Sequence, residues 1–173
     1  RQMGMLKKNK KKMIDNPDLK VRKNTSSGEF ILKKTVYLCD TNAFGNAYFA
    51  KYLEWQGMAR EAFFREIMPD QNYLINSGIK LITKRAAVEY KHEVYLYDDI
   101  EITLQVGAVK QASSDLLFTY RKQSDGSVFA RGYQTVVFAD EKGKLMKIPE
   151  LIVKNARPYV NEVRYVIGKV FQS

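Results

Sequence analysis

Cysteine and histidine are almost absent from this sequence, and their scarcity excludes several kinds of site. The chain has one cysteine, Cys39, and one histidine, His92. A single thiol cannot close an internal disulfide, and one residue of each type is too few for a zinc site or a Cys–His catalytic pair. We therefore expect no metal and no cofactor, and the lack of disulfides indicates a reducing, cytoplasmic location.

Long hydrophobic runs are also missing. No apolar stretch in the 173 residues approaches the roughly 20 residues that a membrane-spanning helix needs, and no signal-peptide pattern is visible. We therefore expect no membrane partner. The length is typical of one domain with a buried core and additional terminal segments.

The net charge of +10 is concentrated at one end of the chain. Residues 1–34 contain 11 Lys and Arg against 3 Asp and Glu, whereas the remaining 139 residues contain 18 against 16. A basic segment can contact nucleic acid, but this one has no interleaved aromatic residues and no nucleic-acid-binding motif accompanies it. We interpret residues 1–28 as a basic, disordered tail or linker and do not expect nucleic acid as a partner.

The most informative stretch is a short strand, a turn and a long helix. A β-rich run at Phe30–Cys39 leads into a polar turn at Asp40–Asn46, and a helical pattern extends from Ala47 to about Met68. At about 100° per residue, four charged side chains form one narrow stripe, namely Lys51, Glu54, Glu61 and Arg65. Nearly every other position is apolar, so this helix is predicted to be surrounded by protein.

Arg60 departs from this pattern. It projects about 140° from the charged stripe, on the side of Leu53 and of Gln56. A buried guanidinium costs several kcal/mol unless it is paired. Two interpretations remain open: Arg60 reaches solvent or closes a buried ion pair, or it faces a cleft that holds an anion or a developing oxyanion.

Four strands are predicted after the helix. They are preceded by a loop at Pro69–Gly78 and lie at Ile79–Tyr90 (with a possible continuation at His92–Tyr97), Asp99–Lys110, Ser114–Gln123 and Val128–Ala139. A strand, a long buried helix and then an antiparallel meander predict an α+β fold of the hotdog type, a curved antiparallel sheet wrapped around a long central helix. This domain is expected at 29–150. Residues 151–173 are a C-terminal extension, in which Tyr159–Phe171 could be strand or helix.

The turn before the helix is the candidate site. The first amides of a helix lack intrahelical partners and carry partial positive charge, which suits a carbonyl oxygen that becomes an oxyanion. Gly45 is expected to supply a backbone conformation or a close approach that a Cβ would block. Asn42 or Asn46 could instead cap the helix, and we favour that role for Asn46. Asp40 is expected to orient the turn by hydrogen bonding.

The segment from Asp40 to Trp55 resembles the signature of the 4-hydroxybenzoyl-CoA thioesterase-like hotdog family, in which an acid-x-acid turn leads into glycine, an aromatic residue and Asn/Lys-Tyr-Leu. The later Tyr97-Asp98-Asp99-Ile100 is similar to the family's pre-strand pattern. Most members carry a catalytic aspartate at the position of Asn42. One branch, the thioesterases of enediyne and related polyketide pathways, carries asparagine there and an arginine in a Trp-Gln-Gly-x-x-Arg-Glu segment, and residues 41–61 resemble that branch.

The resemblance implies roles for individual residues. Asn42 and Arg60 would position the thioester and stabilise its oxyanion, while the backbone amide of Phe49 would polarise the carbonyl. Without a carboxylate base, water would attack a thioester activated by electrostatics and positioning. The remaining substrate-binding residues would be Tyr52, Gly45 and Tyr48. Aromatic residues of this segment would form the core or line an apolar acyl tunnel.

The function that the resemblance implies is hydrolysis of a polyketide or fatty acyl thioester from the phosphopantetheine arm of an acyl carrier protein. It also implies a homodimer or homotetramer, because sites in this fold normally form between subunits. Two alternatives stay open. The protein could be an acyl-CoA thioesterase, or a non-catalytic acyl-binding hotdog module of a synthase, which asparagine at position 42 would permit.

Overall fold

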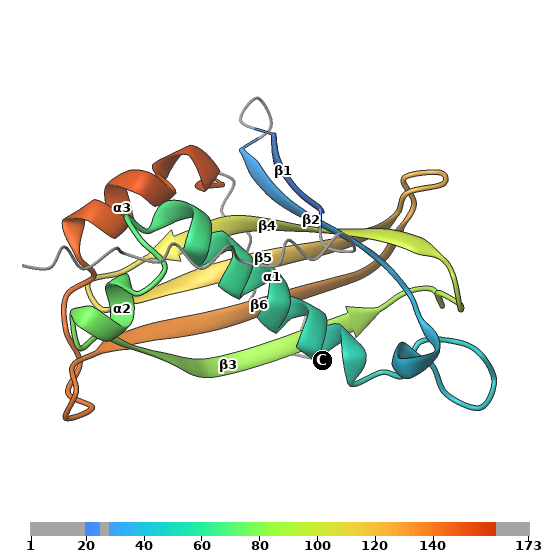
Figure 1. The fold of residues 1–173 in the computed structure, drawn as a ribbon, viewed down its shortest axis with the longest axis horizontal. Helices are drawn as coiled ribbons and strands as arrows, with labels where there is room; N and C mark the ends of the chain where they lie inside the picture. The colour runs from blue at the N-terminus through green and yellow to red at the C-terminus, as the bar shows by residue number, and fades with distance from the viewer. Residues whose placement is uncertain (1–19, 25–27, 162–173) are drawn as a thin grey trace, which may run out of the picture.

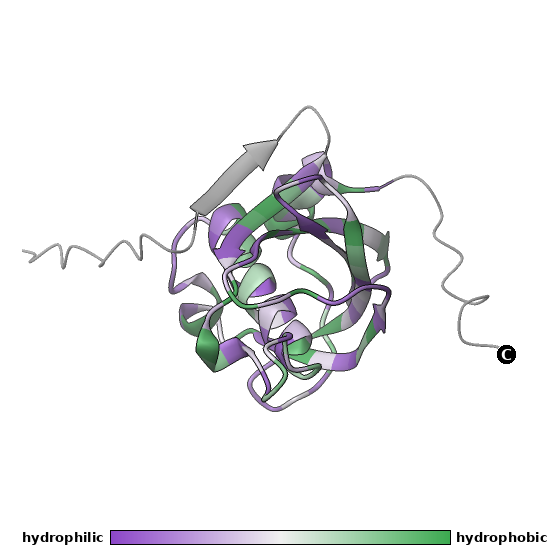
Figure 2. Cartoon of the chain, turned by 90° about the vertical axis from the view of Figure 1, so that its right-hand side faces the viewer, coloured by the Kyte–Doolittle hydropathy of each residue, from purple (hydrophilic) through white to green (hydrophobic). Residues whose placement is uncertain are grey.

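The computed structural model describes residues 20–24 and 28–161, and it consists of one antiparallel sheet curved around a central helix (Figure 1). Helix α1 (Lys51–Ile67) crosses the concave face of the sheet. The strand order is β1-β2-β4-β5-β6-β3. The strands are β1 (Lys20–Asn24), β2 (Glu29–Thr35), β3 (Lys80–Tyr90), β4 (Asp99–Val109), β5 (Ser113–Lys122) and β6 (Val128–Ala139). The end-on view in Figure 2 shows the sheet curling around the helix, and the predicted α+β hotdog fold is confirmed.

The strands are not a continuous meander, in contrast to the prediction. β3 pairs with β6 rather than with β4, which follows it in the sequence, and β2 pairs with β4. Helix α1 joins β2 to β3 across the concave face, so these two strands lie on opposite sides of the β4-β5-β6 hairpins. β3 is consequently an edge strand.

The core lies between α1 and the sheet. Trp55, Ala59 and Phe63 recur at every fourth position of α1 and are buried, as one face of a helix requires. They meet the alternate residues of the sheet, of which Ile100 and Leu104 on β4 are fully buried. This packing fixes the helix on the sheet and so sets the position of its first turn.

The first strand and the helix have different bounds from those predicted. β2 ends at Thr35 rather than at Cys39, because Leu38–Asp40 forms a short 3-10 turn, η1. Helix α1 begins at Lys51 rather than at Ala47. The amide of Ala47 donates to the carbonyl of Val94 (2.8 Å), so tertiary hydrogen bonds hold a segment that periodicity assigned to the helix.

The expected capping role of Asn46 is wrong. The N-cap position is Ala50, which offers no side-chain acceptor. Asn46 instead donates from its Nδ2 to Glu93 (2.8 Å) and forms an isolated bridge with Tyr95. The segment predicted to continue β3 therefore meets the turn before α1 instead.

Four elements lie in segments that were predicted to be irregular or were left unassigned. Helix α2 (Tyr73–Asn76) lies in the loop before β3. Helix α3 (Glu150–Ala156) and the 3-10 turn η2 (Arg157–Tyr159) pack against the far end of α1, where Tyr159 contacts Phe63. Strand β1 lies within the predicted tail and pairs with β2, whereas residues 1–19, 25–27 and 162–173 lie outside the described residues. Within the described ranges, no helix is long and apolar enough to span a membrane.

Candidate active site

Residues 41–47 form a small hairpin at the end of the molecule where α1 begins. Thr41 and Ala47 make an antiparallel bridge, and the amide of Gly45 donates to the carbonyl of Asn42 (3.0 Å). Gly45 has a φ of +81°, in the left-handed region that favours glycine. A Cβ added there would meet no neighbouring atom. The backbone conformation, rather than a close approach, therefore requires this glycine.

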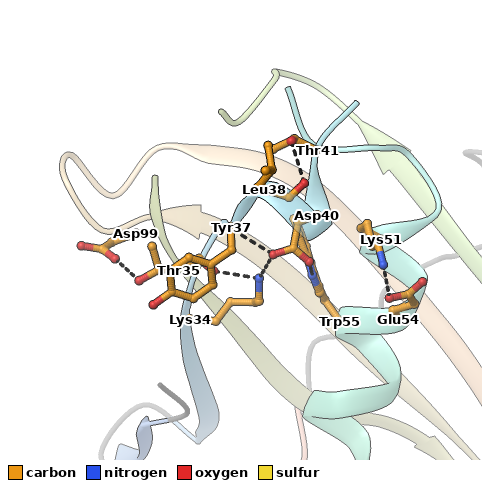
Figure 3. Close-up of polar contacts among 10 residues, drawn as sticks. All are labelled: Lys34, Thr35, Tyr37, Leu38, Asp40, Thr41, Lys51, Glu54, Trp55 and Asp99. Atoms are coloured by element: carbon orange, nitrogen blue, oxygen red, sulfur yellow. Dashed lines mark hydrogen bonds and ion pairs between the residues drawn. The ribbon is translucent and has the colours of Figure 1, made fainter. Parts of the chain in front are cut away.

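Asp40 anchors the hairpin (Figure 3). Its side chain is buried, and its Oδ2 accepts hydrogen bonds from Lys34 Nζ (2.7 Å) and from the amide of Tyr37 (3.0 Å). Its Oδ1 accepts from the indole of Trp55 (3.3 Å) on α1. One carboxylate thus joins the loop to both β2 and the helix.

The pKa of Asp40 follows from these contacts. Burial alone would raise it, but the hydrogen bond and charge of Lys34, with the hydrogen bonds from Tyr37 and Trp55, hold it below its usual value. The carboxylate is therefore charged at neutral pH and is occupied by three donors. This environment suits an anchor rather than a general base.

Asn42 presents one free donor. Its Oδ1 accepts from the amide of Phe44 (2.9 Å), which fixes the orientation of the side-chain amide. Its Nδ2 makes no hydrogen bond within the described part of the chain. The side chain is partly exposed, so this N–H pair is accessible to a ligand.

The start of α1 supplies two more free donors. The amides of Phe49 and Ala50 make no hydrogen bond with any described residue, whereas those of Tyr48 and Lys51 are both used in the turn. The carbonyl of Phe49 accepts from the hydroxyl of Tyr90 (2.9 Å) on β3, which fixes the Phe49–Ala50 peptide and with it the amide of Ala50. An unpaired N–H at a helix N-terminus favours negative charge nearby.

Aromatic side chains surround this end of the helix in two different environments. Tyr48 and Phe49 are exposed and lie in contact (4.6 Å between ring centroids). Tyr52 is 3% exposed and packs against Tyr90 (5.0 Å) and Tyr120 (5.7 Å). Burial raises the pKa of Tyr52 to about 12, so its hydroxyl is neutral at physiological pH.

Arg60 lies farther along α1, between the helix and β3. Its Nη1 donates to Thr83 Oγ1 (2.6 Å) and to Gln134 Oε1 (3.3 Å), and its Nη2 pairs with Glu61 (2.9 Å). The guanidinium does form an ion pair, but the partner carboxylate is on the surface and the Arg60 side chain is 19% exposed. Pairing therefore leaves the group accessible to an anion.

Two buried glutamines form a network behind Arg60: Gln134 contacts it, and Gln56 contacts Gln134. The sequence analysis did not identify Gln134. Gln134 Nε2 donates to Gln56 Oε1 (3.1 Å), and Gln56 Nε2 donates to the carbonyl of Ala87 (3.0 Å). A Cβ added at Gly132 would overlap Gln56 Nε2, so the network needs glycine there. Gln134 could have been identified from the sequence as a polar residue at an inward-facing position of β6.

One chain does not bring all the predicted site residues together. Asn42 and the amide of Phe49 lie at the same end of α1. Arg60 follows Lys51 by nine residues, which places it about 14 Å along the axis at a rise of about 1.5 Å per residue. Within one subunit, Arg60 is therefore separated from the other two groups.

An apolar cavity lies beyond Arg60 at the C-terminal end of α1. Its volume is about 90 Å³. It is lined by the following residues among others: Phe63, Phe64, Leu116, Phe138, Ile152 and Ala156. Phe63 and Phe64 come one helical turn after Arg60. The aromatic residues expected to line an acyl tunnel, those of the 44–55 segment, do not contribute to this cavity.

Nothing among the described residues suggests a metal centre, since no group of three or more His, Cys, Asp or Glu side chains lies close together. The polar groups at the site are amides, a guanidinium and tyrosine hydroxyls. These can bind and stabilise a carbonyl oxygen that gains negative charge.

The sequence was compared with protein families and with known proteins. Residues 36–156 match the model of a family described as the thioesterase-like superfamily. No curated protein matches the sequence significantly.

Many solved structures are similar to this one. The dynemicin thioesterase, whose structures report polyene binding, has a TM-score of 0.72 and 25% identity, over 77% of this chain and 98% of its own. A gentisyl-coenzyme A thioesterase has a TM-score of 0.64 and 24% identity, and the match covers 72% of this chain and 98% of the thioesterase. A 1,4-dihydroxy-2-naphthoyl-CoA thioesterase from Synechocystis has a TM-score of 0.69 and 18% identity, over 75% and 96%. The last two share the fold.

Proposed function

The chain belongs to the thioesterase-like superfamily, and on this premise we propose that it hydrolyses an acyl thioester carried on the phosphopantetheine arm of an acyl carrier protein. Thioester hydrolysis in general is supported by the family and by the thioesterases among the similar structures. The carrier-bound substrate and the roles of individual residues are the proposal.

The observation that carries the proposal is the unpaired amide of Phe49 at the N-terminus of α1. Water attacks the thioester carbonyl carbon, and the carbonyl oxygen gains negative charge in the tetrahedral intermediate. The Phe49 amide and the helix dipole stabilise that oxygen. The carbon–sulfur bond then breaks and releases the thiol of the arm and the free acid.

Asn42 positions the thioester from the other side of the turn. Its free Nδ2 donates either to the carbonyl oxygen or to the attacking water. The neighbouring Asp40 is engaged by three donors, and Glu93 accepts from Asn46 and from Tyr95. Activation therefore comes from oriented donors and not from a carboxylate base.

Arg60 joins the site through a second copy of the chain. Tyr48 and Phe49, just before α1, and Leu53, in its first turn, are 45%, 60% and 41% exposed although they are apolar or aromatic. β3 is an edge strand beside them. A two-fold related copy would cover this surface and carry its own Arg60 toward the loop of its partner. We therefore propose a homodimer or a larger homo-oligomer as the active form.

The acyl group is proposed to be an apolar chain, with a polyketide as the first candidate. The dynemicin thioesterase, at 25% identity, is the similar structure for which polyene binding is reported. The cavity of about 90 Å³ that begins one turn beyond Arg60 is suited to an apolar segment. An acyl-CoA substrate is the second candidate, since two of the similar structures are coenzyme A thioesterases.

The test is the release of free thiol from matched acyl-carrier and acyl-CoA thioesters. Arg60→Ala and Asn42→Ala should each lower kcat by about 100- to 1000-fold, the usual cost of losing one oxyanion donor. Arg65→Ala and Asn76→Ala are matched controls, because both residues are exposed and lie outside the site. Turnover that is indifferent to both site substitutions would place the chemistry elsewhere. A folded protein that binds acyl chains without turnover would instead be a binding module.

A further inference from the structure

One hydroxyl group lies in the wall of the apolar cavity at the C-terminal end of α1. The residues that line this cavity are apolar except for two, Ser114 and Arg157. Arg157 is exposed, so its charge is solvated at the rim, whereas Ser114 is only 8% exposed. Ser114 therefore supplies the polar group in the interior of the wall.

Ser114 occupies an inward-facing position of β5 at which its surroundings favour an apolar residue. Alternate residues of β5 are buried from Ser114 onward, and the next three of them are leucine, phenylalanine and tyrosine. Its cross-strand neighbours are Val109 on β4 and Val136 on β6. None of these four side chains offers Ser114 a hydrogen bond, so packing alone does not account for a serine here.

The hydroxyl of Ser114 is poorly satisfied. Within the described part of the chain, its one hydrogen bond goes to the backbone carbonyl of the next residue, Asp115, at 3.4 Å. Bonds of the O–H···O type are usually about 2.7–2.8 Å long. A buried hydroxyl with so weak a partner lowers stability unless another group completes its bonding. The cavity is the side from which such a group can approach.

The cavity has room for more than a water molecule. Its volume is about 90 Å³, whereas one water needs roughly 10–15 Å³. The wall begins with Phe63, one turn beyond Arg60, and extends to Ile67. Ile67 follows Arg60 by seven residues, or about 10 Å along the helix axis. An extended chain covers that distance in about nine bonds, at roughly 3.4 Å per three bonds.

We propose that Ser114 binds an oxygen-containing group, a hydroxyl or an oxo group, near the distal end of the acyl chain. The acyl group is then an otherwise apolar chain with one oxygen within about nine bonds of the thioester carbon. The inference rests on the proposed thioesterase function and names the class of acyl group that it accepts.

Both groups complete the bonding of the serine. A hydroxyl on the chain donates to Ser114 Oγ, and an oxo group accepts from its O–H. A plain alkyl chain leaves the buried hydroxyl unpaired. A site built to bond a substrate oxygen discriminates against the analogue that lacks it, so Ser114 acts as a specificity-determining residue.

The experiment compares chains that differ only in this oxygen. Thiol release is measured with decanoyl thioesters of the carrier protein, either plain or with a hydroxyl or an oxo group at carbon 7 or 9. The enzymes are the wild type, Ser114→Ala and Ser113→Ala. Ser113 is the neighbouring serine on the opposite face of the strand, which makes Ser113→Ala a matched control.

The wild type should turn over at least one oxygenated chain with a kcat/KM about tenfold above that for the plain chain. Ser114→Ala should lose this preference and should accept the plain chain at least as well as the wild type does. Ser113→Ala should keep the wild-type ratio. A preference for the hydroxyl alone, or for the oxo group alone, would support the inference and identify the group.

Three results would overturn the inference and leave the thioesterase intact: a wild type that does not prefer any oxygenated chain, a preference that survives Ser114→Ala, or an equal loss for all chains in that variant. If no chain is turned over, the thioesterase proposal fails. Calorimetry with decanoic acid and its oxygenated analogues, on the wild type and Ser114→Ala, then decides the role of Ser114. Equal affinities for the plain and oxygenated acids would exclude it.

Discussion

The two ends of helix α1 are built by different means. At the N-terminal end, a single buried carboxylate, Asp40, accepts three hydrogen bonds and leaves free amides beside it. At the C-terminal end, aromatic and aliphatic side chains from α1, the sheet and α3 surround an apolar cavity. Directional contacts fix the position of donors to within a few tenths of an ångström, whereas dispersion contacts only shape a volume. The first arrangement suits a reacting carbonyl, and the second suits the chain attached to it.

Replacing Asp40 should have the largest effect on stability, and it should disturb only the N-terminal end of α1. Asp40→Ala leaves Lys34 buried without its partner, and such a loss costs about 3–5 kcal/mol. Urea unfolding monitored by circular dichroism measures the change. Asp125→Ala, in an exposed turn, is the control and should be close to neutral. A loss below about 1 kcal/mol would show that the ion pair does not hold the loop.

Breaking the glutamine network should affect turnover more than stability. Gln134→Leu removes an acceptor of Arg60 and should lower kcat about tenfold, equivalent to about 1.4 kcal/mol. It also leaves Gln56 Oε1 buried without a donor, which costs stability. In Gln56→Leu/Gln134→Leu the buried Oε1 is removed, so part of the stability should recover while kcat stays low; recovery is only partial because the carbonyl of Ala87 loses Gln56 Nε2 as its donor. If both stability and kcat recover in the double variant, the glutamine network has only a structural role.

Filling the cavity at the C-terminal end of α1 should change the binding of long acyl chains and leave the polar end of the helix unaffected. Ala156→Leu places three additional carbon atoms at the wall of the cavity, and the unfolding free energy should change by about 1 kcal/mol or less. The KM for long acyl chains should rise while that for an acetyl thioester is unchanged. Equal KM changes for both chain lengths would mean that the cavity does not receive the acyl group.

The smallest expected effect is a difference in acid stability. The pKa of Asp40 is depressed in the folded state, so its contribution is present above the ordinary value of 3.8 and is lost as the pH falls through the folded value. Asp40→Asn has no such titration. The unfolding free energies of wild type and variant should therefore converge below about pH 4, as urea titrations from pH 7 to pH 3 would measure. A constant difference over that range would contradict a depressed pKa.

Much of the fold followed from local patterns. The spacing of Trp55, Ala59 and Phe63 gave the buried helix, and the alternation through β4 gave its strand, because both depend on side chains close in sequence. Gly45 was anticipated from its place in a turn. The start of α1 was missed since the amide of Ala47 is bound by Val94, far along the chain, and periodicity cannot detect such a bond.

The parts of the site that escaped prediction are also non-local. β3 pairs with β6 because α1 crosses the sheet, and only this pairing places Gln134 beside Arg60. The apolar cavity depends on α3, a segment left unassigned, folding back onto the end of α1. The roles of Asn42, Phe49 and Arg60 in catalysis remain predictions that the variants above address.

Strand β3 contains a bulge, since its register passes from Thr83↔Val136 to Arg85↔Thr135 and leaves Lys84 as an extra residue, and this gives the strand a tolerance of length that substitutions would not reveal. Inward-facing positions are odd-numbered before Lys84 and even-numbered after it, as Leu81 and Val88 illustrate. Lys84 is exposed and its side chain can be replaced freely as far as the core is concerned. Deleting the residue removes the bulge, because Thr83 and Arg85 then become neighbours opposite Val136 and Thr135, and the core residues on both sides keep their faces. We therefore expect β3 to tolerate the loss of one residue at Lys84, whereas a deletion near either end of the strand would turn residues on one side of it to the wrong face.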